Sequence, residues 1–442
     1  MELRDLIVTP IVLILVYVVA YLIRPHVTDN VNRKYFFPAL TVRIIGALAL
    51  GFLYQFYYSG GDTFNFHTHG SRHVWEAFMD SPITGIKLLL ADGVYPEGSY
   101  RYASQIIFFH DPSSYFVIRI ASLFDILTFS SYSATAVLFA VISFIGGWAL
   151  FKAFYQMKPE WHFWQAIACL FVPSVVFWGS GLLKDTITLS ALGVITLVFS
   201  SFIQRRYSLL GFIILLFNFW ILFSVKKYIL MCFVPALFFW YYGARLFAIR
   251  SVILKTLLIP IVAGLLIVSG YYAVVLIGAD DSRYALENIA TTAKITAYDI
   301  GFYTGKDAGS QYDLGELDGT FSGMIGKAPQ AINVSLFRPY LWEVKNPLML
   351  ISALESLILV LLTIYIIFSS GLLITKGLVK PNVIFCLVFS LTFAFAVGVS
   401  TFNFGTLVRY KIPLLPFYLL ALIEIYFYVK SLRKLSVLER TE

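Results

Sequence analysis

The stretch IIGALALGFLYQFYYSGGDTFNFHTHGSRH, residues 44–73, changes its chemical character at its midpoint. Its first half is apolar and uncharged, as in a helix that crosses a membrane, whereas its second half contains an aspartate, three histidines and an arginine. Gly60 and Gly61 separate the two halves and allow the backbone to turn sharply. The stretch therefore predicts a membrane helix that ends at an interface lined by ionisable side chains.

The composition of the whole chain agrees with this prediction. Of its 442 residues, 59% are hydrophobic, 17% aromatic and only 13% charged, and the mean hydropathy is +0.80. A chain of this composition cannot cover a water-soluble surface. The net charge of +8 comes from short Lys and Arg clusters between apolar runs, a distribution typical of orientation signals, and it argues against a nucleic-acid partner. Cys169, Cys232 and Cys386 all lie in apolar runs and are predicted to be core thiols.

The apolar runs predict an all-α polytopic membrane protein, with residues 1–442 forming a single transmembrane domain. A membrane helix needs about 20 apolar residues, and on this basis we expect about eleven spans. The first run is expected to be a retained span, because no small-residue cleavage site follows it. The expected spans are 6–23, 40–58, 132–151, 162–180, 186–203, 209–224, 228–247, 256–278, 346–368, 382–400 and 412–428.

The positive-inside rule predicts the orientation of these spans. One set of alternate connections carries most of the clustered Lys and Arg residues and is expected to be cytoplasmic. The N-terminus and two long segments, 59–131 and 279–345, are then outside. The run 113–129 is interpreted as an amphipathic helix on the outer surface, because counting it as a span would reverse the charge pattern downstream. The cytoplasmic set comprises Arg24, Arg33, Lys34, Lys152, Lys158, Arg205, Arg206, Arg245, Arg250, Lys255, Lys376, Lys380, Lys430, Arg433 and Lys434.

Asp62 is the first candidate functional residue, because a carboxylate at the membrane interface is placed to act as a general base. A helix cap or a solvated loop residue is the alternative interpretation. The nearby His67, His69, Arg72 and His73 are predicted to contact substrate or lipid phosphate. Two imidazoles and a carboxylate are also a common ligand set for a divalent metal, although the H-x-H spacing alone is a weak signal.

Further candidates lie in outward connections. Lys184 and Asp185 form either a turn-stabilising couple or part of an active site. Cations beside an aromatic ring suit a lipid-linked phosphate, and simple snorkelling of flanking cations is the alternative. Glu355 and Glu424 are predicted to be interior hydrogen-bonding residues. The cationic candidates with their aromatic neighbour are Arg338, Arg409, Tyr410 and Lys411.

Three short motifs resemble those of the GT-C glycosyltransferases, integral membrane enzymes that use polyprenyl-phosphate sugar donors. They are GGDT at 60–63, LLKDT at 182–186 and RYKIPLLPF at 409–417. The resemblance implies that Asp62 is the catalytic carboxylate of the first loop and Asp185 the acidic residue of the second, with Arg409 facing the donor phosphate. This chain has a lone aspartate in its first loop rather than an acidic pair, which leaves dependence on a divalent metal open.

The expected activity is transfer of a sugar from a polyprenyl-phosphate donor to a glycan, lipid or protein acceptor, on the outer face of a bacterial inner membrane. No cofactor is required by this scheme beyond a possible divalent metal. A polysaccharide polymerase or ligase would share the lipid-linked donor but should place key Arg and His residues in segment 279–345, which has no histidine. A transporter would favour charges near the middle of the membrane and a repeat between its halves.

Overall fold

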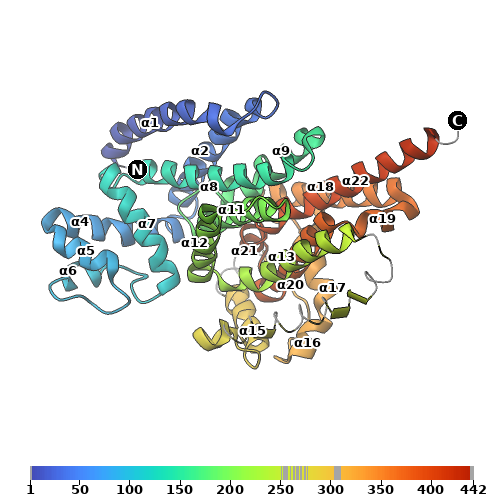
Figure 1. Cartoon of the computed structure of the whole chain (residues 1–442). Coiled ribbons are helices and arrows are strands. Elements are labelled where there is room, and N and C mark those ends of the chain that lie inside the picture. Colours follow the sequence, from blue (N-terminus) through green and yellow to red (C-terminus); the bar gives the residue numbers. More distant parts are fainter. Residues whose placement is uncertain are drawn as a thin grey trace. The chain divides into compact units, whose positions relative to one another are not determined.

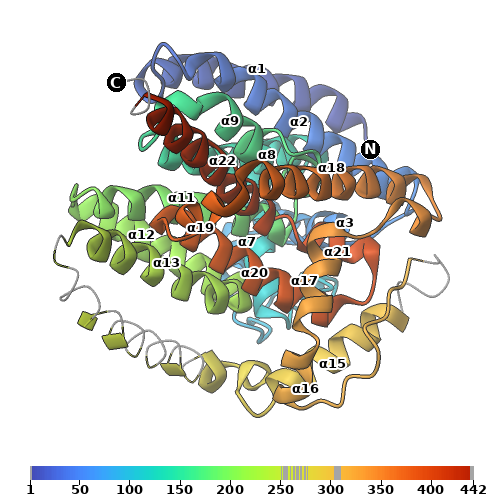
Figure 2. The same ribbon diagram turned by 90° about the vertical axis from the view of Figure 1, so that its right-hand side faces the viewer.

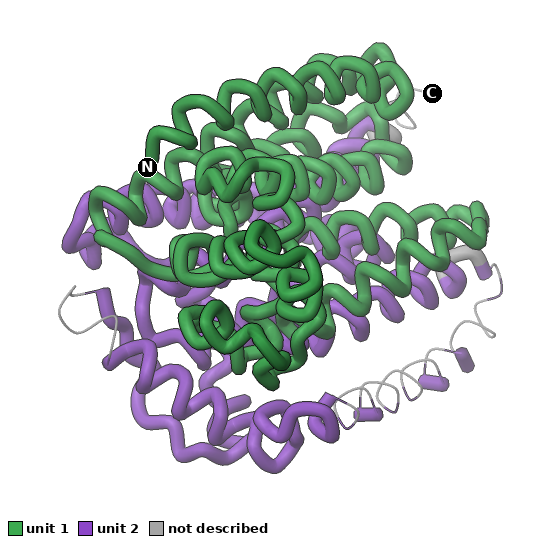
Figure 3. Tube along the Cα trace, turned by 90° about the vertical axis from the view of Figure 1, so that its left-hand side faces the viewer, with its two compact units in different colours: residues 1–226 green, residues 227–442 purple. Residues whose placement is uncertain are grey.

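The computed structural model describes residues 2–249, 251, 277–302 and 310–438, with isolated positions between 257 and 275 (Figure 1). The described residues are mostly helical and form no β-sheet. Eight of the described helices are long and apolar enough to cross a membrane. The chain divides into two compact units, residues 1–226 and 227–442, coloured separately in Figure 3.

The first unit contains six long helices and a group of shorter ones. The long helices are α1 (Leu3–Val27), α2 (Arg33–Phe56), α7 (Pro112–Thr128), α8 (Tyr132–Tyr155), α11 (Lys184–Ile203) and α12 (Leu209–Val225). The shorter helices between α2 and α7 are α3 (Asp62–Phe66), the π-helical turn η1 (His67–Ser71), α4 (Arg72–Asp80), α5 (Pro82–Leu90) and α6 (Tyr100–Ala103). After α8 follow η2 (Pro159–Trp161), α9 (His162–Leu170) and α10 (Pro173–Trp178).

Polar contacts distinguish the two ends of this unit. At the end that contains Asp62, hereafter the Asp62 end, Arg72 Nη1 lies 2.6 Å from Glu2 Oε1, and Arg4 donates to the carbonyl of Phe129. At the other end, hereafter the Asp29 end, Tyr155 donates to Asp29 over 3.0 Å. The charges that sequence analysis assigns to opposite sides of the membrane therefore separate to opposite ends of the unit, although which end faces outward stays a prediction.

At the Asp29 end, Lys152 also donates to the carbonyl of Val27. Helix α9 begins shortly after α8 ends, and α10 leads to Lys184, which contacts the Asp62 end. Helix α12 likewise returns the chain to this end, since Lys226 at its C-terminus pairs with Asp185. The α9–α10 pair and the 17-residue α12 thus each run from one end of the unit to the other.

The run predicted as the span 162–180 is a broken helix rather than a continuous one. Helix α9 ends at Leu170 and α10 begins at Pro173, because proline has no N–H to continue the hydrogen-bond ladder. The buried guanidinium of Arg43 on α2 reaches this break, where it donates to the carbonyls of Val175 (2.8 Å) and Cys169 (3.4 Å). The Val175 carbonyl also accepts from the backbone N–H of Gly179, whereas the Cys169 carbonyl has lost its donor at Pro173. In a lipid environment that carbonyl needs a donor from the protein, and Arg43 supplies it.

Helices α8 and α11 pack closely because glycines face each other across their interface. A Cβ atom added to Gly146 would lie 2.1 Å from Ser190 Cα, and one added to Gly193 would lie 2.0 Å from the carbonyl oxygen of Gly146. Any larger side chain would push the helices apart, as in other membrane helix pairs joined through small residues. This contact fixes α11, whose first two residues are Lys184 and Asp185.

The second unit is built around α20 (Pro381–Thr401), which packs against α13 (Lys227–Ala248), α15 (Ile289–Ile300), α17 (Ala328–Phe337) and α22 (Leu414–Leu438) (Figure 2). Helix α18 (Pro347–Ser370) packs on α22 and α17. The remaining elements are η3 (Ser282–Tyr284), α16 (Phe321–Gly326), η5 (Leu341–Glu343), η6 (Gly371–Leu373), α19 (Ile374–Leu378) and α21 (Phe404–Tyr410).

The structure confirms an all-helical membrane protein but not the number of eleven spans. Eight predicted spans coincide with the eight candidate membrane helices. Of the other three, 162–180 is broken, 209–224 corresponds to the shorter helix α12, and 256–278 lies largely outside the described residues. The predicted helices of segment 59–131 are present. Among them, α7 is buried along much of its length against α8, α12 and η1.

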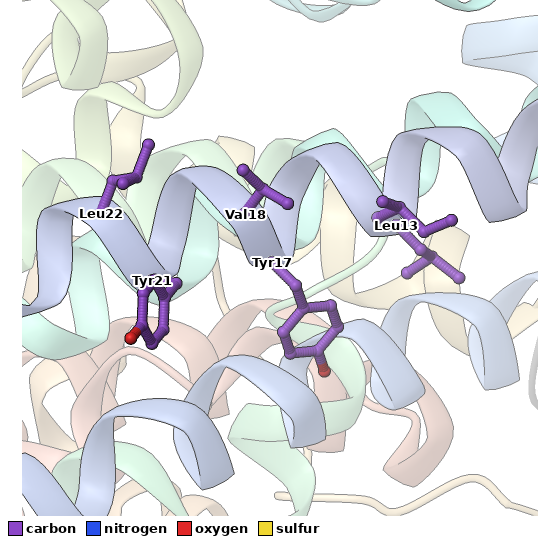
Figure 4. Close-up of a pocket in the computed structure, with 6 residues that line it drawn as sticks. Leu13, Tyr17, Val18, Tyr21 and Leu22 are labelled. Atoms are coloured by element: carbon purple, nitrogen blue, oxygen red, sulfur yellow. The ribbon is translucent and has the colours of Figure 1, made fainter.

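An apolar groove of about 420 Å³ opens along α1 and is lined by Leu13, Ile14, Tyr17, Val18, Tyr21 and Leu22 (Figure 4). Tyr17 shares a hydrogen bond of 2.7 Å with Thr41 on α2, which fixes one edge of the groove. The lining offers no carboxylate, imidazole or amine for chemistry, and on a membrane helix such a surface suits contact with lipid chains.

The orientation can be tested by labelling single cysteines in a background without native cysteines. We expect a membrane-impermeant maleimide to label cysteines at the exposed positions Ser104 and Glu316 in intact cells, and to leave a cysteine at the exposed Glu160 unlabelled until the membrane is opened. Labelling of Glu160→Cys in intact cells, with protection of Ser104→Cys, would reverse the predicted orientation of the first unit.

Candidate functional site

The glycine turn before Asp62 has the predicted sharp geometry. Ser59, Gly60 and Gly61 all adopt positive φ, at 56°, 137° and 125°. A Cβ atom at Gly61 would lie 2.7 Å from the ring of Tyr54, so both conformation and space require glycine there. Helix α3 begins directly after this turn, and Asp62 is its first residue, partly exposed at the surface of the unit.

Lys184 connects the start of α11 to Asp111, the residue that caps α7. Its ammonium lies 2.7 Å from Ser113 Oγ and 3.3 Å from Asp111 Oδ2. The charge of Asp62 also acts on Lys184, less strongly than that of Asp111. Asp62, Asp111 and Lys184 come from three separate segments of the chain. We call these residues, together with Ser113, the charged cluster.

Asp111 is held in its ionised form within the charged cluster. It caps α7, where its carboxylate accepts hydrogen bonds from the Ser113 and Ser114 side chains. Partial burial alone would raise the pKa of Asp111. The Ser114 hydrogen bond, the Lys184 charge and the Ser113 hydrogen bond outweigh this effect and lower the pKa to about 2.

Lys184 and Asp185 are neighbours in sequence but do not form the couple that one interpretation of the sequence suggested. Asp185 points to a different partner, the ammonium of Lys226, and both side chains are buried. Removing one partner of such a pair leaves an uncompensated buried charge and costs about 3–5 kcal/mol. The pair therefore holds the start of α11 against the end of α12. Because Asp185 directly follows Lys184 in the sequence, the pair also holds the backbone next to Lys184.

Three of the four residues predicted to line a pocket with Asp62 lie against other carboxylates. His67 is fully buried, with its Nε2 3.4 Å from Asp125 Oδ1. His69 is exposed on η1, Arg72 pairs with Glu2, and His73 lies 3.0 Å from Glu76 Oε2. Within the described parts of the chain, no three His, Cys, Asp or Glu side chains are grouped so that they could hold a metal ion.

The second unit contains a separate group of cations. Arg338 pairs with Glu343, and its guanidinium lies 5.2 Å from the ring centroid of Phe404. Lys411 is buried, with its ammonium 3.3 Å from both the carbonyl of Arg338 and Ser356 Oγ. Burial lowers the pKa of Lys411 to about 8, an effect that the charge of Glu355 opposes. Lys411 thus does not snorkel to a surface of this unit.

Arg409 and Tyr410 lie at the end of α21, before this buried lysine. Both are partly exposed, and the Arg409 guanidinium lies 5.9 Å from the centroid of the Tyr410 ring. Elsewhere in the unit, Glu424 is buried and accepts a hydrogen bond of 3.0 Å from Asn382, which confirms its prediction as an interior hydrogen-bonding residue.

Sequence reasoning missed Asp111, Ser113 and Lys226 as members of these groups. The motif Asp111-Pro112-Ser113 carries the signal of a helix start, an N-cap residue followed by proline, but this signal does not show which residue the cap side chain will meet. The predicted burial of Cys169 and Cys386 is confirmed, and Cys232 is partly buried.

Comparisons with protein-family models, with curated proteins and with solved structures find no match to this chain.

The lowered pKa of Asp111 predicts how stability depends on pH. An unfolded aspartate has a pKa near 3.8, so the stabilising interactions of folded Asp111 are complete above about pH 4 and are lost as pH falls towards 2. We expect Asp111→Asn to lower the melting temperature at pH 7 and to lower it less at pH 3. A melting-temperature difference that stays constant over this range would show that Asp111 does not gain from ionisation.

Proposed function

We propose that this protein is an integral membrane glycosyltransferase of GT-C type, which transfers a sugar from a polyprenyl-phosphate donor to an acceptor on the outer face of a bacterial inner membrane. The observation that carries the proposal is the position of Asp62. Its carboxylate begins a helix at the exit of α2 and interacts with Lys184, within a cluster assembled from three separate segments.

The chemistry requires only a base and a stabilised leaving group. In a single displacement, the acceptor hydroxyl oxygen attacks the anomeric carbon and its proton passes to the Asp62 carboxylate. The bond between the anomeric carbon and the phosphate oxygen breaks, and polyprenyl phosphate leaves with the electron pair. The sugar configuration is inverted, and the donor's own phosphate is the leaving group, so the scheme needs no redox partner.

The other residues of the site act on Asp62 or on its surroundings. Lys184 is held by Asp111 and Ser113, so its ammonium has a fixed position from which its charge acts on Asp62. Asp185 is fully buried and paired, and we assign it the role of holding the N-terminus of α11, rather than direct contact with substrate. A lysine that is fixed by two partners contributes a positioned charge with little entropic cost.

A substitution at Asp62 tests the proposal directly. We expect Asp62→Asn to remain folded and to lower turnover roughly a hundredfold, the scale of a lost general base. Release of polyprenyl phosphate from a panel of undecaprenyl-phosphate hexoses and pentoses is the measurement. Asp92→Asn removes an exposed carboxylate elsewhere in the same segment and serves as the matched control. Equal turnover of Asp62→Asn and the wild type would remove Asp62 from the mechanism.

A second prediction concerns the cations of residues 227–442 alone. If Arg409 contacts a lipid-linked phosphate, Arg409→Ala should weaken binding of undecaprenyl phosphate by about 1.5–3 kcal/mol, the range for a charge-assisted hydrogen bond. Arg283→Ala removes another arginine of this unit, one that is 71% exposed and paired with Asp281, and is the control. Equal binding by the two variants would show that Arg409 has no part in phosphate recognition.

A further inference from the structure

A second polar group, which the proposed chemistry does not use, is buried behind α3. It consists of His67, Ser71, Asp125 and Thr135, whose side chains are all fully buried. Asp125 Oδ2 accepts a hydrogen bond of 2.6 Å from Ser71 Oγ, and its Oδ1 accepts one of 2.7 Å from Thr135 Oγ1. We call this group the Asp125 cluster.

His67 completes the Asp125 cluster without forming a hydrogen bond in it. Its Nε2 lies 3.4 Å from Asp125 Oδ1, an ion-pair distance whenever the imidazole carries its second proton, but the alignment does not make a hydrogen bond. Neither ring nitrogen of His67 has a hydrogen-bond partner among the described residues. A buried polar group left in this state is costly, so its place in the fold calls for an explanation.

The Asp125 cluster holds the turn that follows the helix of Asp62. Ser71 and His67 are the last and first residues of η1, a π-helical turn of a kind frequent at functional sites. The backbone N–H of His67 closes α3 by donating to the carbonyl of Thr63. Asp125 on α7 therefore holds the last residue of η1 by a hydrogen bond, and its carboxylate lies against the imidazole of the first, His67, whose backbone closes a helix only five residues long.

Helix α8 holds α3 from another side. The Tyr132 hydroxyl shares a hydrogen bond of 2.8 Å with Thr63, and its ring stacks on Phe64 with centroids 4.6 Å apart. The His67 ring meets Tyr132 edge-on at 5.4 Å. Each of these contacts lies within about one and a half helical turns of Asp62. On the N-terminal side of Asp62, the backbone N–H of Gly60 donates to the carbonyl of Tyr54 over 2.9 Å, so the glycine turn is held as well.

We propose that Asp125, with His67, is a positioning residue for Asp62, and that the Asp125 cluster sets the orientation of the Asp62 carboxylate rather than contacting substrate. The inference rests on the proposed function for the role of Asp62. The restraint on α3 does not depend on the proposed function. It also gives His67 a different role from the predicted contact with phosphate, because a fully buried imidazole behind α3 is not open to a substrate.

The test uses a readout that requires no turnover. In an Asp62→Cys variant without Cys169, Cys232 and Cys386, the rate at which a methanethiosulfonate reagent modifies the introduced thiol reports how firmly α3 is held. Adding Asp125→Asn keeps the size of the side chain but removes its charge. We expect modification to become roughly tenfold faster, because local opening of α3 becomes easier.

Threonine variants separate positioning from general damage. Thr135→Val removes one hydroxyl donor to Asp125 and should also accelerate modification, whereas Thr135→Ser keeps the donor and should retain the parent rate. Thr196→Val is the matched control, since Thr196 is equally buried but its hydroxyl donates only within its own helix, to Leu192. If Asp125→Asn fails to fold, Thr135→Val and Thr135→Ser decide the outcome.

Turnover supplies the second readout in the chain that retains Asp62. Asp125→Asn and Thr135→Val should lower kcat roughly tenfold or more with little change in KM for the donor, because a base displaced by about 1 Å loses rate rather than binding. Unchanged reactivity of the introduced thiol in Thr135→Val, or equal acceleration in Thr196→Val, would overturn the proposal. Absence of transferase activity in the wild type would refute the proposed function and leave the thiol-modification result standing.

Discussion

The first unit depends on one interaction, the donation of the buried Arg43 guanidinium to the carbonyls of the broken helix. A helix that stops inside a membrane protein leaves carbonyl groups without partners, and lipid offers no donor to replace them. Arg43 Nη1 also lies 3.1 Å from Ser143 Oγ, which itself donates to the carbonyl of Gly179. One side chain thus ties α2, α8 and the end of α10 into a single network.

This network has a direct effect on the candidate site. Gly179 lies shortly before Leu183, where the chain turns into α11 and presents Lys184. Since Arg43 and Ser143 fix the segment before that turn, and the Gly146–Gly193 contact fixes α11 after it, the position of Lys184 is determined from both sides. The charged cluster is therefore supported by apolar and polar contacts deep within the unit, although its members lie near the surface.

The sequence predicts much of the fold and less of the site, for physical reasons. Long apolar runs report membrane helices reliably, because the requirement for about 20 apolar residues is local. The break at Pro173 was not predicted, because the run around it is apolar. The donor that stabilises the break is Arg43, which belongs to a helix far earlier in the sequence. Gly60 and Gly61 predict the turn at Asp62, because the backbone conformation that a glycine allows depends only on that residue. The partners of Lys184 and Asp185 could not be predicted from the sequence. The two residues begin α11, where successive side chains point in different directions, so Lys184 contacts Asp111 and Asp185 contacts Lys226.

The Asp185–Lys226 pair also bears on how the protein enters the membrane. The two partners lie 41 residues apart, at the start of α11 and just after α12. Until α12 has followed α11 into the bilayer, the Asp185 carboxylate lacks the countercharge of Lys226, and an unpaired charge at a buried position opposes stable insertion. Helices α11 and α12 are therefore best inserted together as a hairpin. Lys226 is the last residue of the first unit, so the Asp185–Lys226 pair can form before the ribosome has completed the second unit.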